Sequence, residues 1–263
     1  MRVLTIAGNT FRENVRDKVL YNLILFALVM IVSAIVLAEL TLGHEAKIII
    51  DLGLTSISVF GTLIAIFIGI GLVYKEMERR TVYALLAKPV RRWEFILGKY
   101  LGLLFTLLVN VSIMTAGLVL ALLYQGGLEW RTYVNLLPAV FLIYLSLAVT
   151  TALALVFSTF STPALSALFT LFLWIIGHFN ADLLQFARLT KSAAVGWIAK
   201  VLYYALPNIG NFTSVDSRNV IQSAAYAQPL DALAILWTAV YGVLYCTGLL
   251  SAAVLVFSRR DFK

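Results

Sequence analysis

Charge is scarce in this chain of 263 residues. There are only 20 lysine and arginine and 13 aspartate and glutamate residues, whereas 62% of the residues are apolar and the mean hydropathy is +0.95. Soluble domains do not have this composition. A helix that crosses the hydrocarbon core needs about 20 mostly apolar residues, and uncharged runs of that length recur along the chain. The sequence therefore predicts an all-α integral membrane protein.

Residues that metal sites and intramembrane catalysis require are also rare. The chain has one cysteine, Cys246, and two histidines, His44 and His178. One cysteine cannot form an internal disulfide, and two histidines cannot form a histidine-rich metal cluster. Metalloprotease and serine-hydrolase motifs are missing, and Gly98-Lys99 lacks the rest of a phosphate-binding loop. We predict no catalytic residue, no metal and no cofactor bound by this chain.

Uncharged segments predict six transmembrane helices. Four of them are single runs, at residues 19–38, 52–74, 100–124 and 232–257. Residues 132–181 form an uncharged run of fifty residues, too long for one helix. This run is interrupted near Pro163, which has no backbone N–H to donate, so it predicts a tight hairpin of spans four and five.

Basic residues indicate how these spans are oriented. Fourteen of the twenty lysine and arginine residues lie in residues 2–18, 75–99 and 259–263. By the positive-inside rule, both termini and the loop between spans two and three are cytoplasmic, and residues 182–231 are extracytoplasmic. The net charge of +7 then reflects topology, and no nucleic-acid partner is predicted. We expect one transmembrane domain, residues 1–263, in the lipids of a bacterial inner (cell) membrane.

Two further segments have helical patterns of their own. Residues 1–18 predict an amphipathic helix lying flat on the inner leaflet, with an apolar face formed by Leu4, Ala7, Phe11 and Val15. Within residues 182–231, the apolar stretch "AAVGWIAKVLYYALP" predicts a helix ended by Pro207. In span two, Gly61, Ala65 and Gly69 form a stripe of small residues that allows close helix packing, which we expect to be intramolecular.

The stretch "KEMERRTVYALLAKPVRRWEFILGK", residues 75–99, contains ten charged residues between two uncharged spans. Thr81 can cap a short helix that Pro89 ends, and Val82, Leu85 and Leu86 then share an apolar face outside the membrane. Lys99 is expected to reach water by snorkelling. From the residues alone, a docking helix for a soluble partner and a solvated basic loop are equally supported.

The same stretch resembles a segment found in type-2 ABC exporter permeases. That segment contains, in order, the motifs Glu-x-Glu-x-Gly-Thr, Leu-Leu, x-Lys-Pro-Val and Arg-x-x-x-x-x-Gly-Lys. Arg80 departs from this pattern, because glycine is usual there. The closing "FSRRDFK" also resembles the C-terminal end of the family, and the six-span layout matches nearly the whole chain. The positions that match the pattern are Glu76, Glu78, Thr81, Leu85, Leu86, Pro89, Val90, Arg92, Gly98 and Lys99.

The resemblance implies a non-catalytic permease subunit whose coupling helix, within residues 75–95, docks into a cleft on an ATP-binding subunit. It implies a second permease copy or a related permease, and two ATP-binding cassette subunits that hold ATP and magnesium. The residues it assigns to coupling are Glu76, Glu78, Thr81, Val82, Leu85, Leu86, Lys88, Pro89 and Arg92.

Two other classes of function remain open. One is a secondary carrier that needs no ATPase, although no charged residue lies in the middle of a predicted span to bind a coupling ion. The other is a scaffold or mechanical subunit of an ATP-driven membrane complex. Transport by the chain alone in liposomes would indicate the first, and ATPase binding without solute flux the second.

Overall fold

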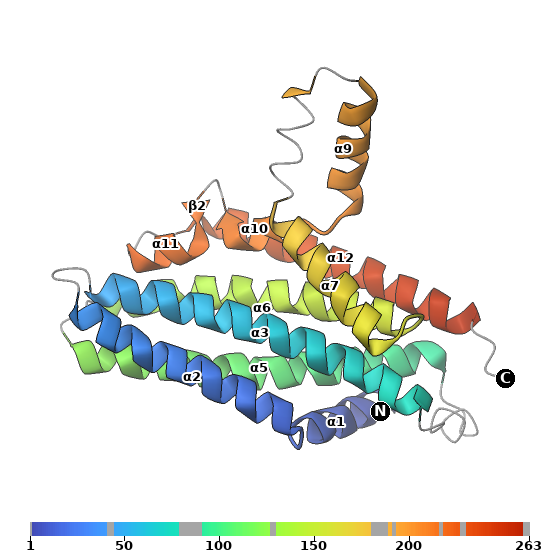
Figure 1. Ribbon diagram of the computed structural model, residues 1–263, viewed down its shortest axis with the longest axis horizontal. Coiled ribbons are helices and arrows are strands. Elements are labelled where there is room, and N and C mark those ends of the chain that lie inside the picture. The colour runs from blue at the N-terminus through green and yellow to red at the C-terminus, as the bar shows by residue number, and fades with distance from the viewer. Residues whose placement is uncertain are drawn as a thin grey trace.

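The protein is a helical bundle in a computed structural model (Figure 1) that describes residues 2–40, 45–78, 91–126, 130–179, 189–190, 193–215, 218–226 and 230–259. The long helices are α2 (Lys18–Glu39), α3 (Glu45–Glu78), α5 (Arg92–Gln125), α6 (Trp130–Ser158) and α12 (Ala232–Arg259). The shorter elements are α1 (Arg2–Asn14), α7 (Pro163–His178), α9 (Ala193–Ala205), α10 (Gly210–Thr213), α11 (Val220–Ala225), β1 (Ser214–Val215) and β2 (Arg218–Asn219).

Among the described residues, five helices are long and apolar enough to cross a membrane. These candidate spans are Lys18–Glu39, Glu45–Gly71, Arg92–Gln125, Thr132–Ser158 and Ala232–Ser258. Each overlaps a span predicted from the sequence. The hairpin break near Pro163 is also present, because α6 ends at Ser158 and α7 begins at Pro163. With 16 residues, α7 is shorter than the five candidate spans.

Helices α3 and α5 extend well beyond the uncharged segments that predicted them. Each has 34 residues, or about 51 Å at 1.5 Å per residue, compared with a hydrocarbon core of about 30 Å. Both ends of residues 79–90 are therefore joined to long, regular helices.

We refer to the region where α1, the end of α3, the start of α5 and the end of α12 lie as the α1 end of the bundle.

The interior of the bundle lies among α3, α5 and α6. Glycines let these helices approach closely: a Cβ on Gly61 would lie 2.7 Å from Leu147 Cδ1 of α6, and one on Gly69 would lie 3.0 Å from Ala154 Cβ. Ala65, between them in the stripe, is 1% exposed. The prediction that this stripe packs within the chain is confirmed.

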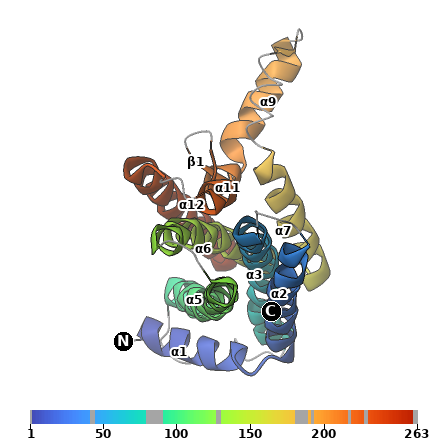
Figure 2. The same cartoon turned by 90° about the vertical axis from the view of Figure 1, so that its left-hand side faces the viewer.

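Short elements between α7 and α12 pack against the long helices, while α9 stands apart over the middle of the bundle (Figure 1). Helix α11 packs against α3 and α6, and α10 packs against α6. Phe212 of α10 is buried. Its ring centroid lies 6.1 Å from that of Tyr241 in α12. Helix α9 forms where the apolar stretch predicted it, and it projects away from the bundle in both views (Figures 1 and 2).

Candidate functional site

The predicted coupling residues are distributed over three parts of the chain. Glu76 and Glu78 lie in the last turn of α3, and Arg92 is the first residue of α5. The remaining predicted coupling residues lie outside the described part of the chain: Thr81, Val82, Leu85, Leu86, Lys88 and Pro89. The structure therefore describes the two helices that flank the segment, α3 and α5. The polar contacts of this region lie at the start of α5.

The first turn of α5 is closed by local hydrogen bonds. Arg91 is extended, with φ −73° and ψ 143°, and its N–H donates to the carboxylate of Glu94 at 2.8 Å. The N–H of Glu94 in turn donates to the Arg91 carbonyl oxygen at 3.0 Å. A glutamate at this position satisfies a backbone donor that no helical carbonyl reaches, and its charge suits a helix N-terminus. The α5 helix therefore begins at a defined residue, Arg92, within the predicted coupling segment of residues 75–95.

Arg92 joins the start of α5 to the end of α12. Its Nη1 donates to the carbonyl oxygen of Phe257 at 3.1 Å and also to that of Ser258. The last carbonyls of a helix have no partner within it, and a cation compensates their partial negative charge. The Phe95 and Phe257 rings stack beside this contact with centroids 5.8 Å apart. The last span is thus attached to α5 by both polar and apolar contacts.

Helix α1 crosses α5 at very close range. In Figure 2 the long helices are seen nearly end-on, and α1 runs across α5. A Cβ on Gly98 would lie 2.7 Å from Ile6 Cβ, and one on Gly102 would lie 2.6 Å from Thr10 Cβ. Only glycine permits this separation, because any other residue would overlap α1. The glycines therefore form a groove that accepts one face of α1.

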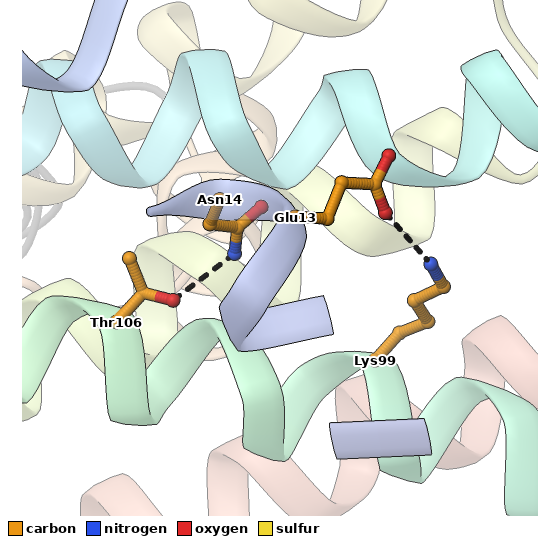
Figure 3. Close-up of polar contacts among 4 residues, drawn as sticks. All are labelled: Glu13, Asn14, Lys99 and Thr106. Carbon is orange, nitrogen blue, oxygen red and sulfur yellow. Dashed lines mark hydrogen bonds and ion pairs between the residues drawn. The ribbon is translucent and has the colours of Figure 1, made fainter. Parts of the chain in front are cut away.

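Two polar contacts also join α1 to α5 at this crossing, one on either side of Gly102 along α5 (Figure 3). The Asn14 side-chain amide donates to the Thr106 hydroxyl at 3.1 Å, and both residues are buried. Phe11 and Phe105 meet edge to face with centroids 4.7 Å apart. The Thr106 hydroxyl also donates to the Gly102 carbonyl oxygen at 2.9 Å. A hydrogen bond between buried groups favours one register of the two helices, because sliding either helix would take the buried Asn14 amide away from this acceptor.

Lys99 lies within this junction. Its side chain is only 4% exposed, and its Nζ lies 3.7 Å from the carboxylate of Glu13, which is 48% exposed. The expectation that Lys99 reaches water was wrong. The reason is that α1 covers it: once a helix carrying an acidic residue packs over α5, the ammonium group can pair there without leaving the interior.

The face of α1 that packs on α5 is only partly the apolar face predicted to lie on the inner leaflet. Phe11 of that apolar face meets Phe105, but Leu4 is 72% exposed, whereas Thr10 and Asn14, outside it, are 1% and 2% exposed. The groove on α5 suits small and hydrogen-bonding side chains. A signal for this contact was present in the sequence, since Gly98, Gly102 and Thr106 recur every fourth residue and mark a helix-packing surface.

Helix α5 is packed against α1, α3, α6 and α12. Packed interiors are dense and deform little, so a displacement of α5 would be shared with these helices. Among the described residues there is no group of three or more histidine, cysteine or acidic side chains arranged to hold a metal ion.

Fold and site together define a multi-pass, all-helical integral membrane protein with a close-packed junction at one end of the bundle. The family model of the ABC-2 family transporter proteins matches residues 4–262, nearly the whole chain, so the chain belongs to this family. It is accordingly a membrane permease of an ABC transporter, and the family implies ATP-binding cassette subunits as partners. No curated protein matches the chain.

Proposed function

We propose that the chain is the membrane subunit of an ATP-driven exporter, in which residues 75–95 transmit the movement of an ATP-binding subunit. Two permeases, identical or related, would assemble with two such subunits, and the partner chains would bind ATP and magnesium. The observation that carries the proposal is that α5 begins at Arg92, within this segment, and is attached near its start to both α1 and α12. Those attachments give a push on the segment a mechanical route into the spans.

The proposal includes six spans with both termini in the cytoplasm. Helix α7 is the fifth span: its 16 residues cover about 24 Å of a core of about 30 Å, and residues up to 181 are uncharged. The concentration of basic residues at 2–18, 75–99 and 259–263 supports the orientation. In this orientation α1 lies at the cytoplasmic boundary, and its course across the bundle suits a helix lying along a membrane surface.

Orientation is tested with single cysteines in a Cys246→Ala background. Arg91 and Lys200 are both exposed, so a cysteine at either position is open to solvent-borne reagents. A membrane-impermeant thiol reagent should label position 200 in intact cells and position 91 only after permeabilisation. Labelling of position 91 from outside would reverse the orientation and remove the coupling proposal.

Coupling is tested at the predicted apolar face of the segment. Two buried leucines contribute about 2–4 kcal/mol to a docking contact, or about 30- to 1,000-fold in dissociation constant. Leu85→Asp with Leu86→Asp should therefore leave the permease in the membrane but separate it from its ATP-binding partner during purification. Ala84→Asp with Ala87→Asp is the matched control, because helical periodicity puts these residues on the other side.

The measurements are co-purification of the ATPase and ATP-dependent efflux from vesicles containing the complex. Loss of both in the leucine variant, with both retained in the alanine variant, is the expected result. Equal behaviour of the two variants would mean that the segment is a solvated basic loop. Retained ATPase binding with no flux of any solute, in the unaltered complex, would instead indicate a mechanical subunit.

A further inference from the structure

A cavity of about 380 Å³ opens where the turn between α1 and α2 meets α3. Its polar wall comes from the end of α1 and the start of α2, and consists of Glu13, Asn14, Arg16, Asp17 and Lys18. Its apolar wall comes from α3. A volume of this size is typical of small-molecule sites and far exceeds that of a single buried water.

The acidic groups on the polar wall already have partners. The carboxylate of Glu13 lies 3.7 Å from Lys99 Nζ, and that of Asp17 accepts a hydrogen bond from the Val19 N–H at 3.0 Å, which caps α2. Within the described part of the chain, no acidic side chain pairs with Arg16 or Lys18. With Glu13 paired to Lys99, the lining carries two cations against the one carboxylate of Asp17, and this excess of positive charge favours an anionic group.

The cavity also lies at the membrane boundary. The apolar run of α2 begins immediately after Lys18, and the opposite wall is formed by Phe67, Ile68 and Gly71. Phe67 is 53% exposed on a helix that can cross the membrane, whereas Ile68 is 7% exposed. A ligand that fits both walls must carry a negative group at one end and a hydrocarbon chain at the other.

We propose that this cavity binds a glycerophospholipid from the leaflet next to α1. Its phosphate lies between Arg16 and Lys18, and the beginning of one acyl chain packs along Phe67. A guanidinium and an ammonium group donate charge-assisted hydrogen bonds to phosphate oxygens, and basic residues at the membrane surface attract anionic lipids. The bound lipid joins the α1–α2 turn to α3, the helix whose last turn begins the predicted coupling segment.

Native mass spectrometry of the full-length chain, delipidated and then titrated with phosphatidylglycerol, tests the proposal. One molecule should bind more tightly than the rest, and diacylglycerol, which lacks the phosphate, should not replace it. Arg16→Gln with Lys18→Gln should weaken this binding about 30-fold. Arg2→Gln with Arg12→Gln removes the same charge from α1 outside the cavity and should leave the tight binding unchanged.

A second variant tests the apolar wall without altering charge. Gly71→Leu fills the cavity beside Phe67 and should also remove the tightly bound lipid, while thermal unfolding shows that each variant is folded. An excess of inorganic phosphate should not displace the lipid, and displacement would mean a site for free phosphate instead. Tight binding that survives both cavity variants, or that is lost equally in the Arg2 and Arg12 variant, overturns the proposal.

Discussion

Helix α1 leaves no room for a Cβ at Gly102 of α5, and Gly102→Ala tests whether this close approach fixes α1. The added Cβ would lie 2.6 Å from Thr10 Cβ and 2.7 Å from the Ala7 carbonyl oxygen. A backbone oxygen cannot rotate away as a side chain can, so α1 must shift as a whole. Overpacking of this kind costs about 1–3 kcal/mol. The ratio of detached to docked α1 should therefore rise about 5- to 150-fold.

Trypsin cleavage after Arg12 reports this detachment, because cleavage follows the population of the open state when closing is fast. Gly102→Ala should be cleaved faster and should unfold at a lower temperature. Gly8→Ala, on α1 itself, and Gly248→Ala, in α12, are matched controls, because an added Cβ meets no atom within 4 Å at either position. If Gly102→Ala is cleaved no faster than Gly8→Ala, α1 does not pack on α5 as described.

Two further substitutions test the polar contacts at the α1 end of the bundle. Glu13→Gln removes the partner of Lys99 and should lower the free energy of unfolding by about 0.5–1 kcal/mol, since Glu13 is partly solvated. Thermal unfolding in low and high salt measures this loss, and a loss that does not shrink with salt would contradict an ion pair. Arg92→Gln removes charge-assisted hydrogen bonds to the Phe257 and Ser258 carbonyl oxygens, at a cost of about 1.5–3 kcal/mol. Hydrogen exchange should then accelerate at the end of α12 and not at its start, and uniform protection would contradict the contact.

The spans could be predicted from the sequence because the membrane imposes a simple local rule. Without water in the hydrocarbon core, a helical crossing needs a long apolar run, and each candidate span overlaps one of the uncharged runs. Helix ends were less predictable. Helix α3 runs from Glu45 to Glu78, well outside residues 52–74, because a helix can continue into water when its charged residues are good helix formers.

The junction between α1 and α5 could be predicted only in part. The spacing of Gly98 and Gly102 is a signal that a helix can pack there, which the sequence-based predictions did not use, and spacing along one helix does not identify its partner. The partner face includes Thr10 and Asn14, which a hydrophobic pattern places on the solvent side. Long-range packing of polar groups depends on complementary geometry between two helices, which periodicity within one of them does not contain.

The contact between Asn14 and Thr106 also has a consequence for biosynthesis, because 92 positions of chain separate the two residues. At a synthesis rate of about 5–20 residues per second, α1 leaves the ribosome about 5–20 s before its binding groove is complete. For that time its side chains have no protein partner. An amphipathic helix can bind at a membrane surface, so a surface-bound α1 would stay close to the growing bundle until Thr106 has been synthesised.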